Sequence, residues 1–166
     1  GYLIEPVELP IYEGETAADQ LLRLLSLNGL VGYYGGAPAA GEGFYLAYIA
    51  DGNASAAKYN GYTRSAAPAS PRTLGLNPAI PPLLISHLEQ TMTFFDIDDY
   101  EKNWAGYLGE FVFTNGSGWM YAVNNVFPNV GFADCFLADG DVVRVQFTLG
   151  YGEDIGGFGD VGTEIP

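Results

Sequence analysis

Basic residues are scarce in this chain, which has six Lys and Arg against twenty Asp and Glu and a formal net charge of −14. Such a surface repels phosphate backbones and anionic lipid headgroups. No apolar run is long enough to span a bilayer, and no charged and then apolar leader opens the chain. We therefore expect no nucleic acid partner and no direct membrane insertion.

Cysteine and histidine are represented once each. Cys135 has no second cysteine with which to form an intramolecular disulfide, and we interpret it as a small buried apolar residue. His87 alone cannot supply the usual ligands of a zinc site, and the sequence selects no partners for a histidine-based catalytic triad. The scarcity of cysteine and histidine predicts a protein that is not an enzyme.

Acidic residues are present in excess, and they gather after residue 95. Asp96, Asp98 and Asp99 offer enough oxygen atoms for calcium, but the spacing lacks the Gly and the distal Glu of an EF-hand loop. A solvated turn leading into a short helix is the alternative. A pair of carboxylates for glycoside hydrolysis could be drawn from such clusters, although nothing in the sequence selects the pair.

The N-terminal quarter predicts a strand followed by a helix. Residues 3–9 read as a strand that Pro6 restricts to a sheet edge or a bulge. Thr16 is predicted to cap a helix over residues 17–27, with Asp19 at the capping-box position. The apolar stripe of this helix predicts packing against a sheet.

The middle of the chain predicts loops around short elements. Residues 32–43 are rich in Gly and Ala and read as a loop, and residues 44–50 follow as an aromatic-rich strand. Several prolines over residues 66–82 predict an extended surface loop. Pro82 is then the predicted first residue of a helix that extends to residue 92.

The C-terminal half is rich in hairpin signals. Residues 111–114 and 119–123 are predicted strands joined by an Asn-Gly-containing turn. An Asp-Gly-Asp turn at 139–141 precedes a half-buried strand over residues 142–148. A strand, a helix and then hairpins is the element order of an α+β fold. We predict a single domain over residues 1–166, with a flexible tail from about residue 150.

The strand Trp119–Val123 and the turn at 139–141 together resemble the signature of a family of secreted bacterial domains. This is the transcobalamin C-terminal-like, DUF4430-type family of soluble-ligand-binding β-grasp (SLBB) domains. The resemblance covers residues 3–30 and 108–149, so residues 31–107 are expected to be an insertion. It implies a β-grasp-like small mixed sheet packed on one helix, and a secreted or cell-surface location with the leader removed. The low cysteine content suits a Gram-positive bacterium.

The resemblance also implies a ligand site. In transcobalamin-like proteins the strand equivalent to residues 119–123 contributes aromatic and main-chain contacts to cobalamin. By analogy Trp119, Met120 and Tyr121 form an apolar face for a flat ligand, with Asn124 orienting a polar edge. Packing of Trp119 in the core is the alternative.

The expected function is therefore a non-catalytic, secreted or cell-surface module that binds a small molecule, with a corrinoid as one candidate, or a glycan. A structural or adhesive domain that presents residues 31–107 to another surface protein is the first alternative. A hydrolase with two acidic catalytic residues is the second. No cofactor is required by the first of these three functions, and calcium is a weak candidate metal.

Overall fold

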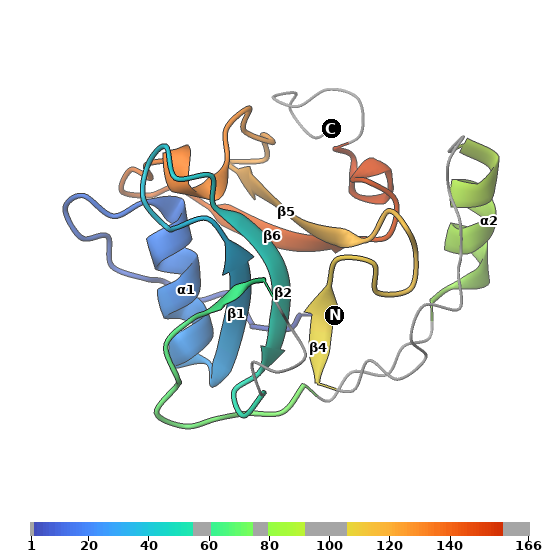
Figure 1. Cartoon of the computed structure of the whole chain (residues 1–166). Coiled ribbons are helices and arrows are strands. Elements are labelled where there is room, and N and C mark those ends of the chain that lie inside the picture. The colour runs from blue at the N-terminus through green and yellow to red at the C-terminus, as the bar shows by residue number, and fades with distance from the viewer. Residues whose placement is uncertain (1, 55–60, 75–79, 92–105, 158–166) are drawn as a thin grey trace. The chain divides into compact units, whose positions relative to one another are not determined.

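The structure is a computed structural model that describes residues 2–54, 61–74, 80–91 and 106–157 (Figure 1). The helices are α1 (Ala17–Leu27) and α2 (Pro82–Thr91), with 3₁₀ turns η2 (Phe132–Asp134) and η3 (Glu153–Ile155). The strands are β1 (Leu30–Gly35), β2 (Tyr45–Asp51), β3 (Thr63–Arg64), β4 (Tyr107–Gly109), β5 (Gly118–Val123) and β6 (Val143–Thr148). Two helices and antiparallel strand pairs confirm the α+β class.

The chain forms two compact units, each built from two separate segments. Unit 1 consists of Gly1–Leu74 and Val130–Asp141, and unit 2 consists of Gly75–Asn129 and Val142–Pro166. The chain therefore passes from the first unit to the second and back before it ends in the second. That residues 1–166 form one domain stays a prediction.

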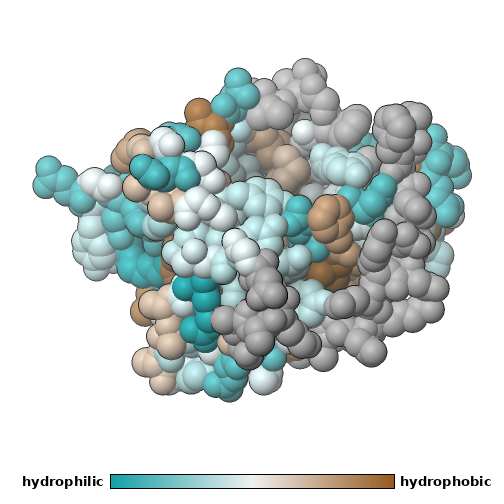
Figure 2. Space-filling view, in the orientation of Figure 1, coloured by the Kyte–Doolittle hydropathy of each residue, from teal (hydrophilic) through white to brown (hydrophobic). Residues whose placement is uncertain are grey.

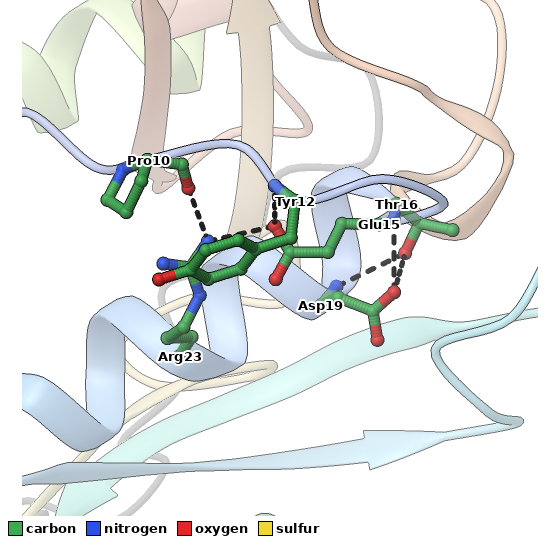
Figure 3. A network of polar contacts seen from close by, with 6 residues as sticks. All are labelled: Pro10, Tyr12, Glu15, Thr16, Asp19 and Arg23. Atoms are coloured by element: carbon green, nitrogen blue, oxygen red, sulfur yellow. Dashed lines mark hydrogen bonds and ion pairs between the residues drawn. The ribbon is translucent and has the colours of Figure 1, made fainter.

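Helix α1 has the N-terminus that the sequence predicted. Thr16 is extended, and its hydroxyl accepts a hydrogen bond from the backbone N–H of Asp19 at 3.2 Å. The Asp19 carboxylate in return accepts from the backbone N–H of Thr16 at 3.0 Å, which completes the capping box (Figure 3). Gly29 follows the helix with a φ of 74°, a conformation that Gly adopts without strain.

The segment before α1 contains no strand, so the strand predicted over residues 3–9 is wrong. Its prolines cannot donate to a ladder, and the carbonyl of Leu3 instead accepts from the Arg72 guanidinium at 2.8 Å. Arg23 of α1 donates to the carbonyl of Pro10 at 2.6 Å and lies 4.5 Å from the ring centroid of Tyr12 (Figure 3). Side chains therefore hold this segment in unit 1.

Unit 1 is built on an antiparallel sheet in the order β3-β1-β2. Strand β1 extends to Gly35, so the loop predicted over residues 32–43 is wrong for its first four residues. A Cβ added at Gly32 would meet Leu22 at 3.1 Å and Leu25 at 3.2 Å, so the glycine lets α1 approach the sheet closely. The region predicted to be an insertion thus supplies the sheet on which α1 packs.

Turn η2 packs beside α1 in unit 1. The backbone N–H of Ala17 donates to the carbonyl of Cys135 at 2.8 Å, and Phe132 meets Phe44 edge to face with ring centroids 6.1 Å apart. Leu25, Leu30 and Val31 are almost fully buried within the unit. The segment Val130–Asp141 therefore joins the fold of residues far earlier in the chain.

Unit 2 is built on the antiparallel hairpin of β5 and β6. Their register pairs Trp119 with Phe147 and Val123 with Val143. Helix α2, which begins at Pro82 as predicted, buries Leu88 against Leu149. Partly buried hydrophobic residues surround this pair, namely Ile80, Leu84, Phe113 and Phe147.

One C-terminal strand prediction is corrected in unit 2. Residues 111–114 form turns rather than a strand. Residues 150–157, expected to belong to a flexible tail, contain η3 and include the buried Gly152 and Gly157. The carboxylate of Asp154 holds this segment by accepting from the backbone N–H of Leu149 at 2.9 Å.

Candidate functional site

Trp119, the centre of the predicted ligand face, takes part in packing within unit 2. Its indole N–H donates to the carbonyl of Leu108 at 2.8 Å, which links β5 to β4. Its ring lies tilted against Phe147, with centroids 5.3 Å apart. Both the polar and the apolar parts of this half-buried side chain therefore have partners inside the unit.

Met120 and Tyr121 do not share a face with each other. Successive side chains of a strand point to opposite sides of the sheet, so Tyr121 lies on the side of Trp119 and Met120 on the other. Tyr121 is buried, and a Cβ added at Gly152 would come within 2.5 Å of the Met120 sulfur. The structure therefore does not gather Trp119, Met120 and Tyr121 into one apolar surface.

Asn124 shapes the end of β5. Asn124 and Asn125 have φ values of 50° and 67°, and Val123 and Val126 exchange backbone hydrogen bonds across them. Positive φ at both central residues is the requirement of a type I′ hairpin turn. The side-chain oxygen of Asn124 accepts from the backbone N–H of Val142 at 2.9 Å. Asn124 thus joins this turn to the start of β6.

The calcium candidates Asp96, Asp98 and Asp99 lie outside the described residues. Within the described part of the chain, no group of three or more His, Cys, Asp or Glu residues is arranged to hold a metal ion.

Another group of residues in unit 2, which the sequence analysis did not single out, has an unusual backbone. Phe111, Phe113 and Tyr151 have φ values of 60°, 79° and 53°. The left-handed region costs a residue with a side chain about 1–2 kcal/mol, and bulky residues are rare there. Sequence patterns carry no signal for this conformation, because the aromatic side chains themselves favour strands.

Buried hydroxyl groups hold the two turns that contain these aromatic residues. Thr114 donates its hydroxyl hydrogen to the carbonyl of Leu149 and accepts from the backbone N–H of Gly116 at 3.1 Å. Thr148 donates to Asp154 and accepts from the backbone N–H of Gly152 at 2.8 Å. Because buried polar groups that are fully paired define a local structure strongly, these contacts oppose relaxation of the strained backbone.

Phe111 and Tyr151 project from these turns into solvent, with 53% and 47% of their surfaces exposed. The backbone N–H of Phe111 donates to the carbonyl of Ser117 at 3.4 Å, and that of Tyr151 donates to the carbonyl of Gly116 at 2.8 Å. The two aromatic residues therefore both bond to the Gly116–Ser117 backbone, and we call these four residues the aromatic platform.

Unit 2, which contains the platform, has a net negative charge. The two segments of unit 2 carry ten Asp and Glu residues and two Lys and Arg residues, a formal charge of −8. Glu110 precedes Phe111 in the chain. Glu153 follows Tyr151 by two residues, and its carboxylate lies 3.4 Å from His87 Nε2 and accepts from the Thr91 hydroxyl at 2.9 Å.

The fold and this site define an α+β protein with exposed aromatic residues in a unit of net negative charge. Residues 100–149 match the family model described as a domain of unknown function, DUF4430. The matched segment, less than a third of the chain, includes β4, β5, β6 and Phe111, and it supports the DUF4430-type resemblance. The link to transcobalamin-like proteins stays a prediction. No curated protein and no solved structure matches the chain. No described helix is both long and apolar enough to cross a membrane.

Proposed function

We propose that this protein is a non-catalytic, secreted or cell-surface module that binds a small molecule or a glycan at the aromatic platform. The observation that carries the proposal is the pair of exposed aromatic residues, Phe111 and Tyr151, held in left-handed backbone conformations. The location outside the cell rests on the DUF4430-type assignment.

The conformational strain supports a binding role. Glycine occupies left-handed positions without steric cost, so an exposed aromatic residue there lowers stability relative to glycine. Strained residues that a surrounding network holds in place concentrate at ligand sites. Phe113 differs because its ring packs against the core of unit 2 and meets Phe147 with centroids 6.4 Å apart. Phe111 and Tyr151 lack that degree of burial.

The form of the surface favours a small ligand over a broad protein interface. On the face that Figure 2 shows, apolar atoms appear as small separate patches among hydrophilic ones. Protein interfaces of standard size bury about 800 Å² per partner, whereas two aromatic rings suit a ligand of a few rings. A corrinoid and a neutral oligosaccharide are both candidates, since each presents a flat apolar face.

A comparison of glycine variants tests the proposal. Calorimetric titration of the whole chain with cobalamin, with cobinamide and with a panel of neutral oligosaccharides identifies a working probe. Phe111→Gly and Tyr151→Gly are expected to weaken its binding by about tenfold or more, while the free energy of unfolding is unchanged or rises by up to about 1 kcal/mol. Phe113→Gly is the matched control, since it removes the same strain together with a packed ring and is expected to destabilise by about 2–4 kcal/mol.

The contrary result is equally clear. A probe that binds with undiminished affinity to Phe111→Gly and to Tyr151→Gly would locate its site elsewhere. If both variants were destabilised as much as Phe113→Gly, the exposed rings would have a structural role and the proposal would lose its basis.

A further inference from the structure

We propose that the open edge of β6 is an interaction surface, and that it pairs in the antiparallel sense with β6 of a second copy of this chain. Strand β6 lies beside β5 in a two-stranded sheet, and no other described strand pairs with it (Figure 1). An unpaired strand edge presents a row of N–H and C=O groups to which another strand can bond.

The backbone bonds at the end of the hairpin show which residues of β6 face this edge. The N–H of Asn124 donates to the carbonyl of Val142 at 2.8 Å, whereas Val123 exchanges bonds with Val126. Residue pairs in antiparallel strands alternate between bonded and non-bonded. Val143, which lies opposite Val123, therefore points its N–H and C=O away from β5.

By the same alternation Val145 and Phe147 also face the open edge. In the part of the chain that the structure describes, the outward N–H and C=O groups of these residues and of Val143 have no hydrogen-bond partner. The start of the strand is open to solvent, since Val142 is 63% exposed, Val143 is 36% exposed and Arg144 is exposed as well. Apart from the charge of Arg144, this edge has no proline or other feature that opposes pairing.

The polar residues of β6 favour a second copy as the partner, in one register. When two copies pair about a two-fold axis at Val145, Arg144 of each copy lies opposite Gln146 of the other. Within the described residues, the buried Oε1 atom of Gln146 has no donor and Arg144 has no ion pair. The guanidinium can donate to that oxygen once the half-buried Gln146 side chain turns toward the edge. A two-fold axis at Arg144 would instead place two like charges opposite each other.

The register about Val145 also uses every outward backbone group of the edge. Val145 pairs with its own copy and Val143 pairs with Phe147, and each pair exchanges two bonds, which gives about six bonds between the copies. The pairing of an aromatic with a β-branched residue is favourable. One pair of strands buries less than the roughly 800 Å² per partner of a standard interface, so we expect a weak dimer with a Kd on the order of 10 µM to 1 mM.

Two measurements on the whole chain test the inference. Sedimentation between about 10 µM and 1 mM follows the monomer–dimer equilibrium, with salt present because the formal charge of −14 on each copy opposes association. NMR then identifies the interface. Val143 and Phe147 are about 13 Å apart along one strand, so a nuclear Overhauser contact between them arises only between copies. We expect this contact to grow with protein concentration.

Variants of the edge complete the test, each checked for folding by circular dichroism. Val143→Pro removes an outward N–H at the first residue of β6, where proline is tolerated, and is expected to weaken dimerisation at least about tenfold. Val143→Thr is the matched control, since it keeps the N–H and the branched shape, and is expected to change the Kd by less than about threefold. Gln146→Lys places a like charge opposite Arg144 and is expected to weaken the dimer, whereas the addition of Arg144→Glu is expected to restore it.

The contrary outcomes are distinct. A chain that stays monomeric at about 1 mM overturns the proposal, as does a dimer whose Kd is unchanged in Val143→Pro and in Gln146→Lys. If Val143→Pro does not fold, the charge exchange between residues 144 and 146 still decides. A monomeric chain whose Val143 and Val145 amide signals shift on addition of a synthetic peptide of residues 142–148 would overturn the second copy as the partner and leave a peptide strand in its place.

Discussion

The ring of Tyr151 lies against the bare α-carbon of Gly116, where a Cβ would come within 2.8 Å of two ring atoms. The two residues also share a hydrogen bond, from the N–H of Tyr151 to the carbonyl of Gly116. The absence of a side chain at Gly116 is thus what allows the strained tyrosine to sit beside it.

Gly116→Ala is expected to destabilise the protein by about 1–3 kcal/mol, because the new methyl group displaces the Tyr151 ring. In a Tyr151→Gly background the same substitution is expected to cost less, with a coupling energy of about 1 kcal/mol or more by urea denaturation. Gly118→Ala is the control, since a Cβ there meets nothing within 4 Å. Additive effects of the two substitutions would contradict the contact.

Trp119→Phe is expected to destabilise the protein by about 1–2 kcal/mol, because the buried carbonyl of Leu108 loses its indole donor. Binding of whichever ligand the aromatic platform accepts is expected to be unchanged in calorimetric titration. A loss of affinity at unchanged stability would instead indicate that the ligand binds at β5, as the transcobalamin-like resemblance implied.

Asn125→Gly and Asn124→Gly are expected to act in opposite directions, although both residues have positive φ. Asn125→Gly relieves the left-handed backbone and gives the preferred Asn-Gly turn, so we expect a gain of about 0.5–1 kcal/mol. Asn124→Gly removes the acceptor of the Val142 N–H, and we expect a loss of about 1 kcal/mol. Thermal denaturation of both variants checks the sign of each change.

Thr16→Ala and Asp19→Ala are each expected to cost about 1 kcal/mol, because each removes one half of the capping box of α1. The double variant is expected to cost less than the two separately, since either loss already breaks the reciprocal pair. Glu13→Ala, at an exposed acidic residue in the preceding turn, is the control and is expected to change stability by less than about 0.5 kcal/mol. A double variant that loses the full sum would argue against reciprocal capping.

Local chemistry explains what the sequence predicted correctly. The capping pair Thr16 and Asp19 is three residues apart, Pro82 opens α2, and the strand predicted over residues 142–148 is found as β6, although its burial does not alternate. Each of these signals depends on neighbours within one turn or one strand. No long-range contact is needed to form them.

The errors come from contacts between residues distant in the chain. The sequence around Gly32 predicts a loop, yet Gly32 lies in β1. The absence of a side chain there leaves room for Leu22 and Leu25 of α1. Residues 111–114 have the composition of a strand, but the bond from Thr114 to the carbonyl of Leu149 fixes them as turns. The aromatic platform depends on that same pairing, so no local pattern could have located it.

The interleaving of the two units has a consequence for synthesis on the ribosome. Residues up to Leu74 leave the ribosome without the segment Val130–Asp141, whose Cys135 carbonyl bonds to Ala17 at the start of α1. At typical elongation rates the nascent unit 1 waits on the order of several seconds for that segment. During this interval the surface of α1 that faces η2 is open to chaperones and proteases. A slow codon cluster placed between residues 74 and 130 is therefore expected to lower the yield of folded protein more than one placed after residue 141.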